Sequence, residues 1–230
     1  MTMRSARLLS MIGLAALSGC LVIKEPTPPP QNLVAFYDGH ETEPPLRRVV
    51  ILPFVNEDGS ERMSMEFVGA LTDAIGKRNV FQTVPVDHDA IDDTAIASLR
   101  LTGVYRTRDL ITIGRRFGAD AVLHGTITNF SGPPHLSISV QLALIDVRHG
   151  TLAYSTQASF DTTEQTVQDD IHNDYEKRHT DRESLVGWRE TLLSPRLFLS
   201  YVGERLAETI GESLKEARAT RVAESQPSNK

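Results

Sequence analysis

The chain has 230 residues, of which 40% are hydrophobic and 23% charged, a composition typical of one globular domain with appendages. Its formal net charge of −6 argues against binding nucleic acid or anionic lipid through bulk electrostatics. The single cysteine, Cys20, excludes an intramolecular disulfide framework.

The N-terminal segment, residues 1–19, has the layout of a secretory signal. Arg4 and Arg7 form a basic start, Leu8–Leu17 is apolar, and small residues follow. The apolar stretch is too short for a transmembrane helix, which needs about 20 residues. We therefore expect the chain to be exported and this segment to be removed.

The end of this segment, Leu17-Ser18-Gly19-Cys20, resembles the lipobox of bacterial lipoproteins position for position. The resemblance implies that Cys20 is diacylated and becomes the first mature residue. Two acyl chains suffice for stable anchoring, whereas one does not. The alternative is an ordinary signal with an incidental cysteine. Leu21 stands where the enterobacterial sorting rule places Asp for inner-membrane retention, so the resemblance implies the outer membrane, on its periplasmic face.

Residues 20–46 are expected to form a tether. Glu25–Gln31 is proline-rich, which favours an extended polyproline II conformation, and Gly39, Pro44 and Pro45 follow without a clear period. The globular domain is predicted to span residues 47–217. The polar residues 218–230 are expected to be a disordered tail.

The first half of the domain begins with Val49–Phe54, a β-branched apolar run typical of a strand buried on both faces. A helix follows, because its side chains recur at helical spacing. The members of that stripe are Phe67, Leu71, Ala74, Ile75 and Arg78, four of them apolar. Val80–Val86 is predicted to be a second strand, and residues 94–100 a short helix.

The middle of the chain predicts one helix and three strands. Thr107 is expected to cap a helix over residues 108–117, with Gly118 in the glycine stop position. Strands are expected over 121–130, 136–144 and 152–160, with a hairpin turn at Asp146–Gly150.

The C-terminal part begins with residues 161–190, a charged insertion in which no apolar stripe is seen before Leu185. Ser194 and Pro195 have the pattern of a cap and a first helical residue. The helix they open has one apolar face, made of Leu199, Val202, Leu206, Ile210 and Leu214. The expected order is β-α-β-α-β-β-β-α, an α/β fold with helices packed on a mixed sheet.

The search for chemistry yields no nucleophile elbow, Walker loop, dinucleotide fingerprint or zinc-protease motif. His172, Glu176 and His179 share one helical face and could hold a metal, but the charged neighbours favour a solvated surface, so we predict no catalytic residue, metal or cofactor. His88 lies in a polar turn, and His124 is expected to be a packed or edge residue. The adjacent acidic pairs Asp92-Asp93 and Asp169-Asp170 are expected to be surface charge, because neighbouring side chains point apart.

Trp188, the sole tryptophan, lies between the charged insertion and the last helix. It is expected to cover the core from the side or to anchor a partner, since tryptophan is enriched at interface hot spots.

Three segments resemble the curli-secretion (CsgG-like) lipoprotein family. They are Arg48–Asn56, Phe117–Ile127 and Leu142–Leu152, which match its first strand, its Gly-Ala-Asp strand and its strand-turn-strand. The group includes the lipoprotein of Pel polysaccharide export and the activator of penicillin-binding proteins, with a domain related to the N-terminal domain of TolB. This sequence lacks the channel's two amphipathic hairpins.

This resemblance implies a non-enzymatic adaptor or ring component in envelope assembly, secretion or polysaccharide export. The implied partners are the membrane, envelope proteins and other copies of the chain, but not nucleic acid. Activation of a peptidoglycan synthase is one alternative. A metal-dependent enzyme that uses His172 and His179 is another.

Overall fold

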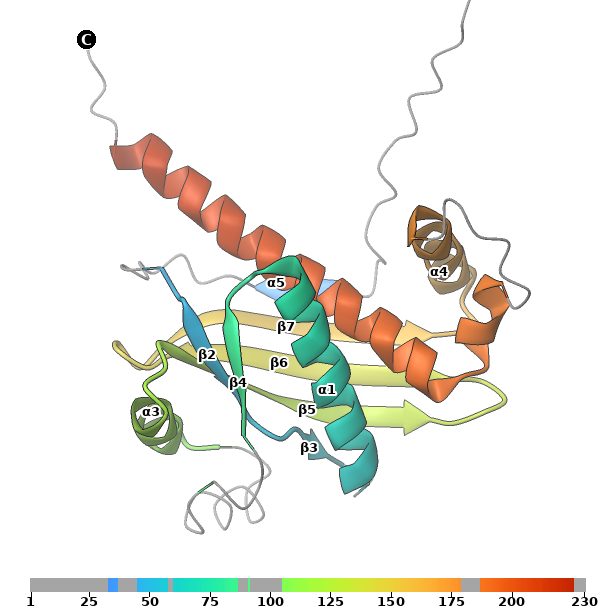
Figure 1. The fold of residues 1–230 in the computed structure, drawn as a ribbon, viewed down its shortest axis with the longest axis horizontal. Coiled ribbons are helices and arrows are strands. Elements are labelled where there is room, and N and C mark those ends of the chain that lie inside the picture. Colours follow the sequence, from blue (N-terminus) through green and yellow to red (C-terminus); the bar gives the residue numbers. More distant parts are fainter. Residues whose placement is uncertain are drawn as a thin grey trace, which may run out of the picture.

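The computed structural model describes residues 33–36, 45–57, 60–86, 91, 105–178 and 187–225. At its centre is a mixed sheet with the strand order β1-β7-β6-β5-β2-β4 (Figure 1). The strands are β1 (Leu33–Phe36), β2 (Arg48–Ile51), β3 (Val55–Asn56), β4 (Gln82–Pro85), β5 (Ala121–Ser131), β6 (Ser137–Asp146) and β7 (Thr151–Asp161). β2 is parallel to β4 and β5, and β5, β6 and β7 form the predicted antiparallel meander.

Helices cover both faces of this sheet, which confirms the predicted α/β class. The helices are α1 (Glu61–Arg78), α3 (Thr107–Arg116), α4 (Gln165–Arg178), the 3-10 helix η2 (Trp188–Leu192) and α5 (Pro195–Ser225). In Figure 1, α1 and α5 lie side by side across one face of the sheet. α3 packs on the opposite face through Leu110 and Ile113.

The two faces are built by alternate residues of β2 and by Leu52, which directly follows it. Val49 and Ile51 belong to the core under α1 and α5, whereas Val50 and Leu52 belong to the core under α3. All four side chains are fully buried, so the predicted two-sided burial of this strand is confirmed.

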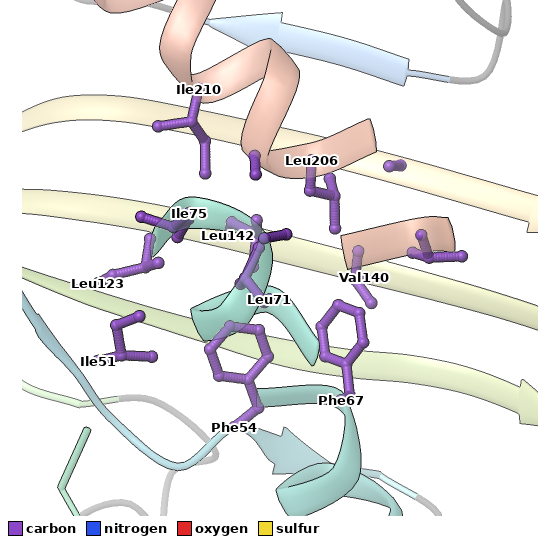
Figure 2. Packing of buried hydrophobic residues seen from close by; sticks show 14 of the residues in the cluster. Ile51, Phe54, Phe67, Leu71, Ile75, Leu123, Val140, Leu142, Leu206 and Ile210 are labelled. Carbon is purple, nitrogen blue, oxygen red and sulfur yellow. The ribbon is translucent and has the colours of Figure 1, made fainter. Parts of the chain in front are cut away.

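The main core lies between the sheet, α1 and α5. Figure 2 shows Leu71 and Ile75 of α1 facing Leu206 and Ile210 of α5, with Leu142 of β6 beneath them. Each is at most 2% exposed. Full burial of such a side chain contributes about 1.5–3 kcal/mol, so this contact holds both helices on the sheet.

Helix α1 has the expected stripe and defined ends. The Ser60 hydroxyl accepts a hydrogen bond from the Met63 amide at 3.4 Å. At the other end Asn79 adopts a left-handed conformation with φ 51°, and the Val80 amide donates to the Ile75 carbonyl. Phe67, Leu71, Ala74 and Ile75 are all buried.

Helix α3 confirms the glycine stop but not the threonine cap. Gly118 has φ 60°, and the amides of Gly118 and Ala119 donate to the carbonyls of Arg115 and Gly114. Thr107 is the first helical residue instead of the cap, and Arg106 occupies the cap position without a side-chain hydrogen bond.

The β6–β7 hairpin turn is held by a buried carboxylate. Asp146 is 0% exposed and accepts bonds from the Arg148 amide at 2.8 Å and the Arg148 guanidinium, with the His149 ring at 3.2 Å. Although burial opposes ionisation, these partners lower the pKa of Asp146. Gly150 closes the turn with φ 69°, which favours glycine.

The charged insertion contains an apolar contact that its sequence pattern does not reveal. Residues 165–178 form α4, in which Val167 and Ile171 are buried in the main core. The expectation that no apolar face precedes Leu185 is therefore wrong. Two residues at spacing i, i+4 are enough to seat one short helix, but too few to stand out as a stripe.

The termini of the domain also differ from the expectation. Leu33–Phe36, expected within the tether, form β1 and pair with β7 in the register Leu33–Ala158 to Phe36–Ser155. Helix α5 continues to Ser225, beyond residue 217, where we expected the domain to end. The predicted helix at 94–100 lies outside the described residues.

Candidate interaction surface

A groove of about 980 Å³ lies between α1, the β5–β6 connection and the first turns of α5. Its apolar lining includes Met63, Met65, Phe130, Pro133 and Leu199, and its charged lining Arg62, Glu66, Asp73, Lys77 and Arg196. The helices approach closely beside it because Gly203 has no side chain. A Cβ there would lie 3.0 Å from the Ala70 carbonyl carbon. The mixed lining suits a protein or lipid contact better than a small charged substrate.

A smaller recess of about 210 Å³ lies between α4, η2 and α5. It is lined by Ile171, Asp174, Tyr175, Arg178, Gly187, Glu190, Thr191, Leu197, Ser200 and Tyr201. Asp174 and Arg178 form an ion pair on α4, so the charges within this recess are already partly neutralised.

Three large hydrophobic side chains are exposed among the described residues. Met65 is 61% exposed, Leu193 63% and Leu197 38%. No sequence motif marks these three residues. Each lies off its helix's buried stripe or beside a helix end, and that offset is the signal that could have found them.

A buried polar network holds α4 against α5. The Asp170 carboxylate accepts bonds from Arg205 Nε and Nη2 and from the Tyr201 hydroxyl, each at 2.6 Å. Arg205 Nη1 also donates to Glu208 at 2.7 Å. Asp170 is only 6% exposed, so the expectation that the pair Asp169-Asp170 is surface charge is wrong for Asp170. Sequence spacing does not reveal a partner that lies 35 residues away.

The electrostatics of this network are those of a structural clamp. Burial opposes the charge of Arg205, but Asp170 and Glu208 raise its pKa. Burial and the adjacent Asp170 carboxylate raise the pKa of the Tyr201 hydroxyl, which keeps it protonated as a donor. These groups saturate one another, so none is poised as a general acid or base.

Trp188 lies beside this clamp and is half-buried. It packs against the main core, and its ring centroid lies 5.1 Å from that of His172. The Arg189 guanidinium lies 5.0 Å over its ring. The core-covering interpretation fits this packing, and the exposed part of the side chain can still contact a partner.

The candidate metal face is only partly within the described structure. His172 Nε2 lies 3.2 Å from a Glu176 carboxylate oxygen, but His179 is outside the described residues, as are His88 and the pair Asp92-Asp93. In the part that the structure describes, no group of three or more potential ligands could hold a metal ion.

His124 occupies the predicted packed position in β5. Its ring lies 6.0 Å from that of Tyr105, edge to face. Burial lowers the pKa of His124 to about 4 and raises that of Tyr105 to about 12. Both groups are therefore uncharged at neutral pH.

Cys20, the predicted lipidation site, lies outside the described residues. Within the described ranges, no helix combines the length and apolar character needed to cross a membrane.

No protein-family model matches the sequence, and no curated protein does. Several solved structures are similar to it. The PelC dodecamer from Paraburkholderia phytofirmans is 13% identical, with a TM-score of 0.46, over 79% of this chain and 95% of that one. The hypothetical protein CT253 from Chlamydia trachomatis is 12% identical, with a TM-score of 0.47, over 74% and 99%. LpoB from Escherichia coli, solved by NMR, is 15% identical, with a TM-score of 0.35, over 67% and 83%.

Proposed function

We propose that this chain is a lipid-anchored periplasmic protein of the outer membrane, which acts as a non-enzymatic adaptor or ring component in cell-envelope assembly, secretion or polysaccharide export. The observation that carries the proposal is Leu17-Ser18-Gly19-Cys20, with the only cysteine of the chain at the modified position. Diacylation of Cys20 supplies the two chains that stable anchoring needs.

The domain contributes a second line of support. The three segments that carry the family resemblance form β2, β5 and the β6–β7 hairpin, which are neighbours in one sheet. Its buried carboxylates, Asp146 and Asp170, accept hydrogen bonds from partners within the domain. The groove beside α1 and α5 offers a surface for a macromolecular partner or another copy of the chain.

The reach of the tether favours an adaptor near its own membrane over an activator of a distant peptidoglycan synthase. If β1 stays paired with β7, the free tether is residues 21–32. At no more than about 3.3–3.6 Å per residue, these span about 40 Å.

The test is expression of the full chain and of its Cys20→Ala variant in a Gram-negative host, with a clickable palmitate analogue. We expect label and membrane sedimentation for the unmodified sequence, and an unlabelled periplasmic protein for the variant. Label that persists in the Cys20→Ala variant would refute lipidation at Cys20. Light scattering of the detergent-extracted protein tests the oligomer, and a strict monomer that co-purifies with nothing would count against the adaptor.

A further inference from the structure

We propose that the domain makes a second contact with the bilayer that holds its anchor, through Met65, Leu193 and Leu197, here called the apolar tip. The proposal rests on the lipid anchor described above and adds an orientation to it. All three side chains are exposed, and they account for the large exposed hydrophobics of the described residues.

The three side chains lie at one end of the molecule, with Met65 in the groove beside α1 and Leu197 in the recess beside α4. Met65 lies in the second turn of α1, and Leu193 and Leu197 flank the start of α5. Met65 lines the same groove as residues 194–196 and the β5–β6 connection. In Figure 1 this is the end at which α5 begins, opposite the end towards which its C-terminal half projects.

The chain enters the domain at that same end. β1 is antiparallel to β7, with Leu33 opposite Ala158 and Phe36 opposite Ser155. The start of β1 therefore points towards the end of β7, where Asp161 pairs with Ser137 directly after the β5–β6 connection. β1, where the described part of the chain begins, therefore starts towards the end of the sheet that carries the apolar tip.

The length of the tether makes this end the one that meets the membrane. Residues 21–32 span at most about 40 Å. Helix α5, with 31 residues, is itself about 46 Å long, so its C-terminal end lies about that far from the apolar tip at its start. A short tether that joins the domain near these three exposed apolar side chains keeps them close to the lipid surface. Their effective concentration at that surface is therefore high.

The chemistry of the apolar tip fits shallow insertion instead of electrostatic adsorption. Of its charged neighbours, Arg62 pairs with Glu66 and Arg189 stacks over Trp188, while Arg196 adds one exposed positive charge. Leucine, methionine and tryptophan near a helix start suit the boundary between headgroups and acyl chains. The contact should therefore depend little on salt, in contrast to binding through a basic patch.

Trp188 provides a built-in probe, because it is the sole tryptophan and η2 leads directly to Leu193. The full lipidated chain is reconstituted into phosphatidylethanolamine–phosphatidylglycerol vesicles that carry brominated acyl chains, which quench tryptophan at the membrane. We expect clear quenching of Trp188 that persists at high salt. Leu193→Asp with Leu197→Asp should abolish most of it while the protein still floats with the vesicles.

Thr112→Asp, an exposed change on α3 at the other end of the domain, is the matched control and should leave the quenching unchanged. Unaltered thermal unfolding of the double variant shows that it still folds. Absence of quenching in the unmodified chain, or equal quenching in both variants, would overturn the proposal. The mass of the mature chain reports lipidation separately. If Cys20 carries no lipid, the anchor fails, and the same quenching measured on the added soluble chain still decides whether the apolar tip contacts lipid.

Discussion

Replacing Asp170 with Ala should be among the most destabilising single changes in the domain. The carboxylate is 6% exposed and accepts three bonds of 2.6 Å from Tyr201 and Arg205. Its removal leaves the Arg205 guanidinium largely buried, with Glu208 as its remaining carboxylate.

The expected magnitude follows from that geometry. Removing one partner of a buried ion pair costs about 3–5 kcal/mol, because the other charge is left without compensation. Since Glu208 still neutralises part of the Arg205 charge, we expect the lower end, about 3 kcal/mol. For a chain of this size, that lowers Tm by about 6–12 °C.

The assay is urea and thermal unfolding of the chain that begins after the signal and carries Cys20→Ala. A double-mutant cycle with Arg205→Met isolates the pair, and the double variant should be less destabilised than the sum of the single variants by more than about 1 kcal/mol. Tyr201→Phe should cost about 1.5–3 kcal/mol, as the loss of a bond to a charged group. A cost of Asp170→Ala below about 1 kcal/mol, or strict additivity in the cycle, would refute the clamp.

Three further predictions concern packing, backbone and pH. Gly114→Ala should lower the free energy of unfolding by about 1–3 kcal/mol, because the new Cβ would lie 2.2 Å from a Val147 methyl. Gly76→Ala, with open space around it, should raise the free energy of unfolding by about 0.5–1 kcal/mol. Equal shifts in the urea midpoint of the two variants would contradict this prediction. Asn79→Ala should cost about 1 kcal/mol in the same assay, since φ 51° is strained for alanine, and an unchanged midpoint would show that the helix end relaxes. The pKa of His124 falls from 6.5 in the unfolded chain to about 4 in the folded one. The contribution of this residue to the free energy of unfolding is therefore complete above pH 6.5 and is lost as the pH falls towards 4. Between pH 7 and pH 4.5 the free energy of unfolding should therefore drop by up to about 3 kcal/mol, and His124→Gln should remove this drop.

The elements read most securely from the sequence were those whose pattern reports burial directly. The run Val49–Phe54 predicted a strand covered on both faces, and Val49, Val50 and Ile51 of β2 are fully buried, although the strand ends at Ile51. The alternation over residues 136–144 predicted β6, and the turn at Asp146–Gly150 joins it to β7. These succeed because side-chain period and turn chemistry are local properties.

The features that the sequence did not predict share a physical cause, because each depends on partners that lie far away in the chain. Asp170 has the sequence context of a surface acid, and only the docking of α4 on α5 brings Arg205 and Tyr201 to it. Leu33–Phe36 lack a periodic pattern, yet the free edge of β7 supplies backbone partners for them. Neither partner can be identified from spacing, since the distances along the chain exceed any helical or strand period.

The sequence by itself determined the α/β class, the strand meander and the stripes of α1 and α5, because each depends on the order of apolar residues along a single element. It also predicts the lipid anchor at Cys20, which remains a proposal. The tertiary structure alone decided which charges are buried, that a strand precedes β2, and that Met65, Leu193 and Leu197 remain exposed. Such relations are set by the packing of distant segments, and packing is a property of the folded chain as a whole.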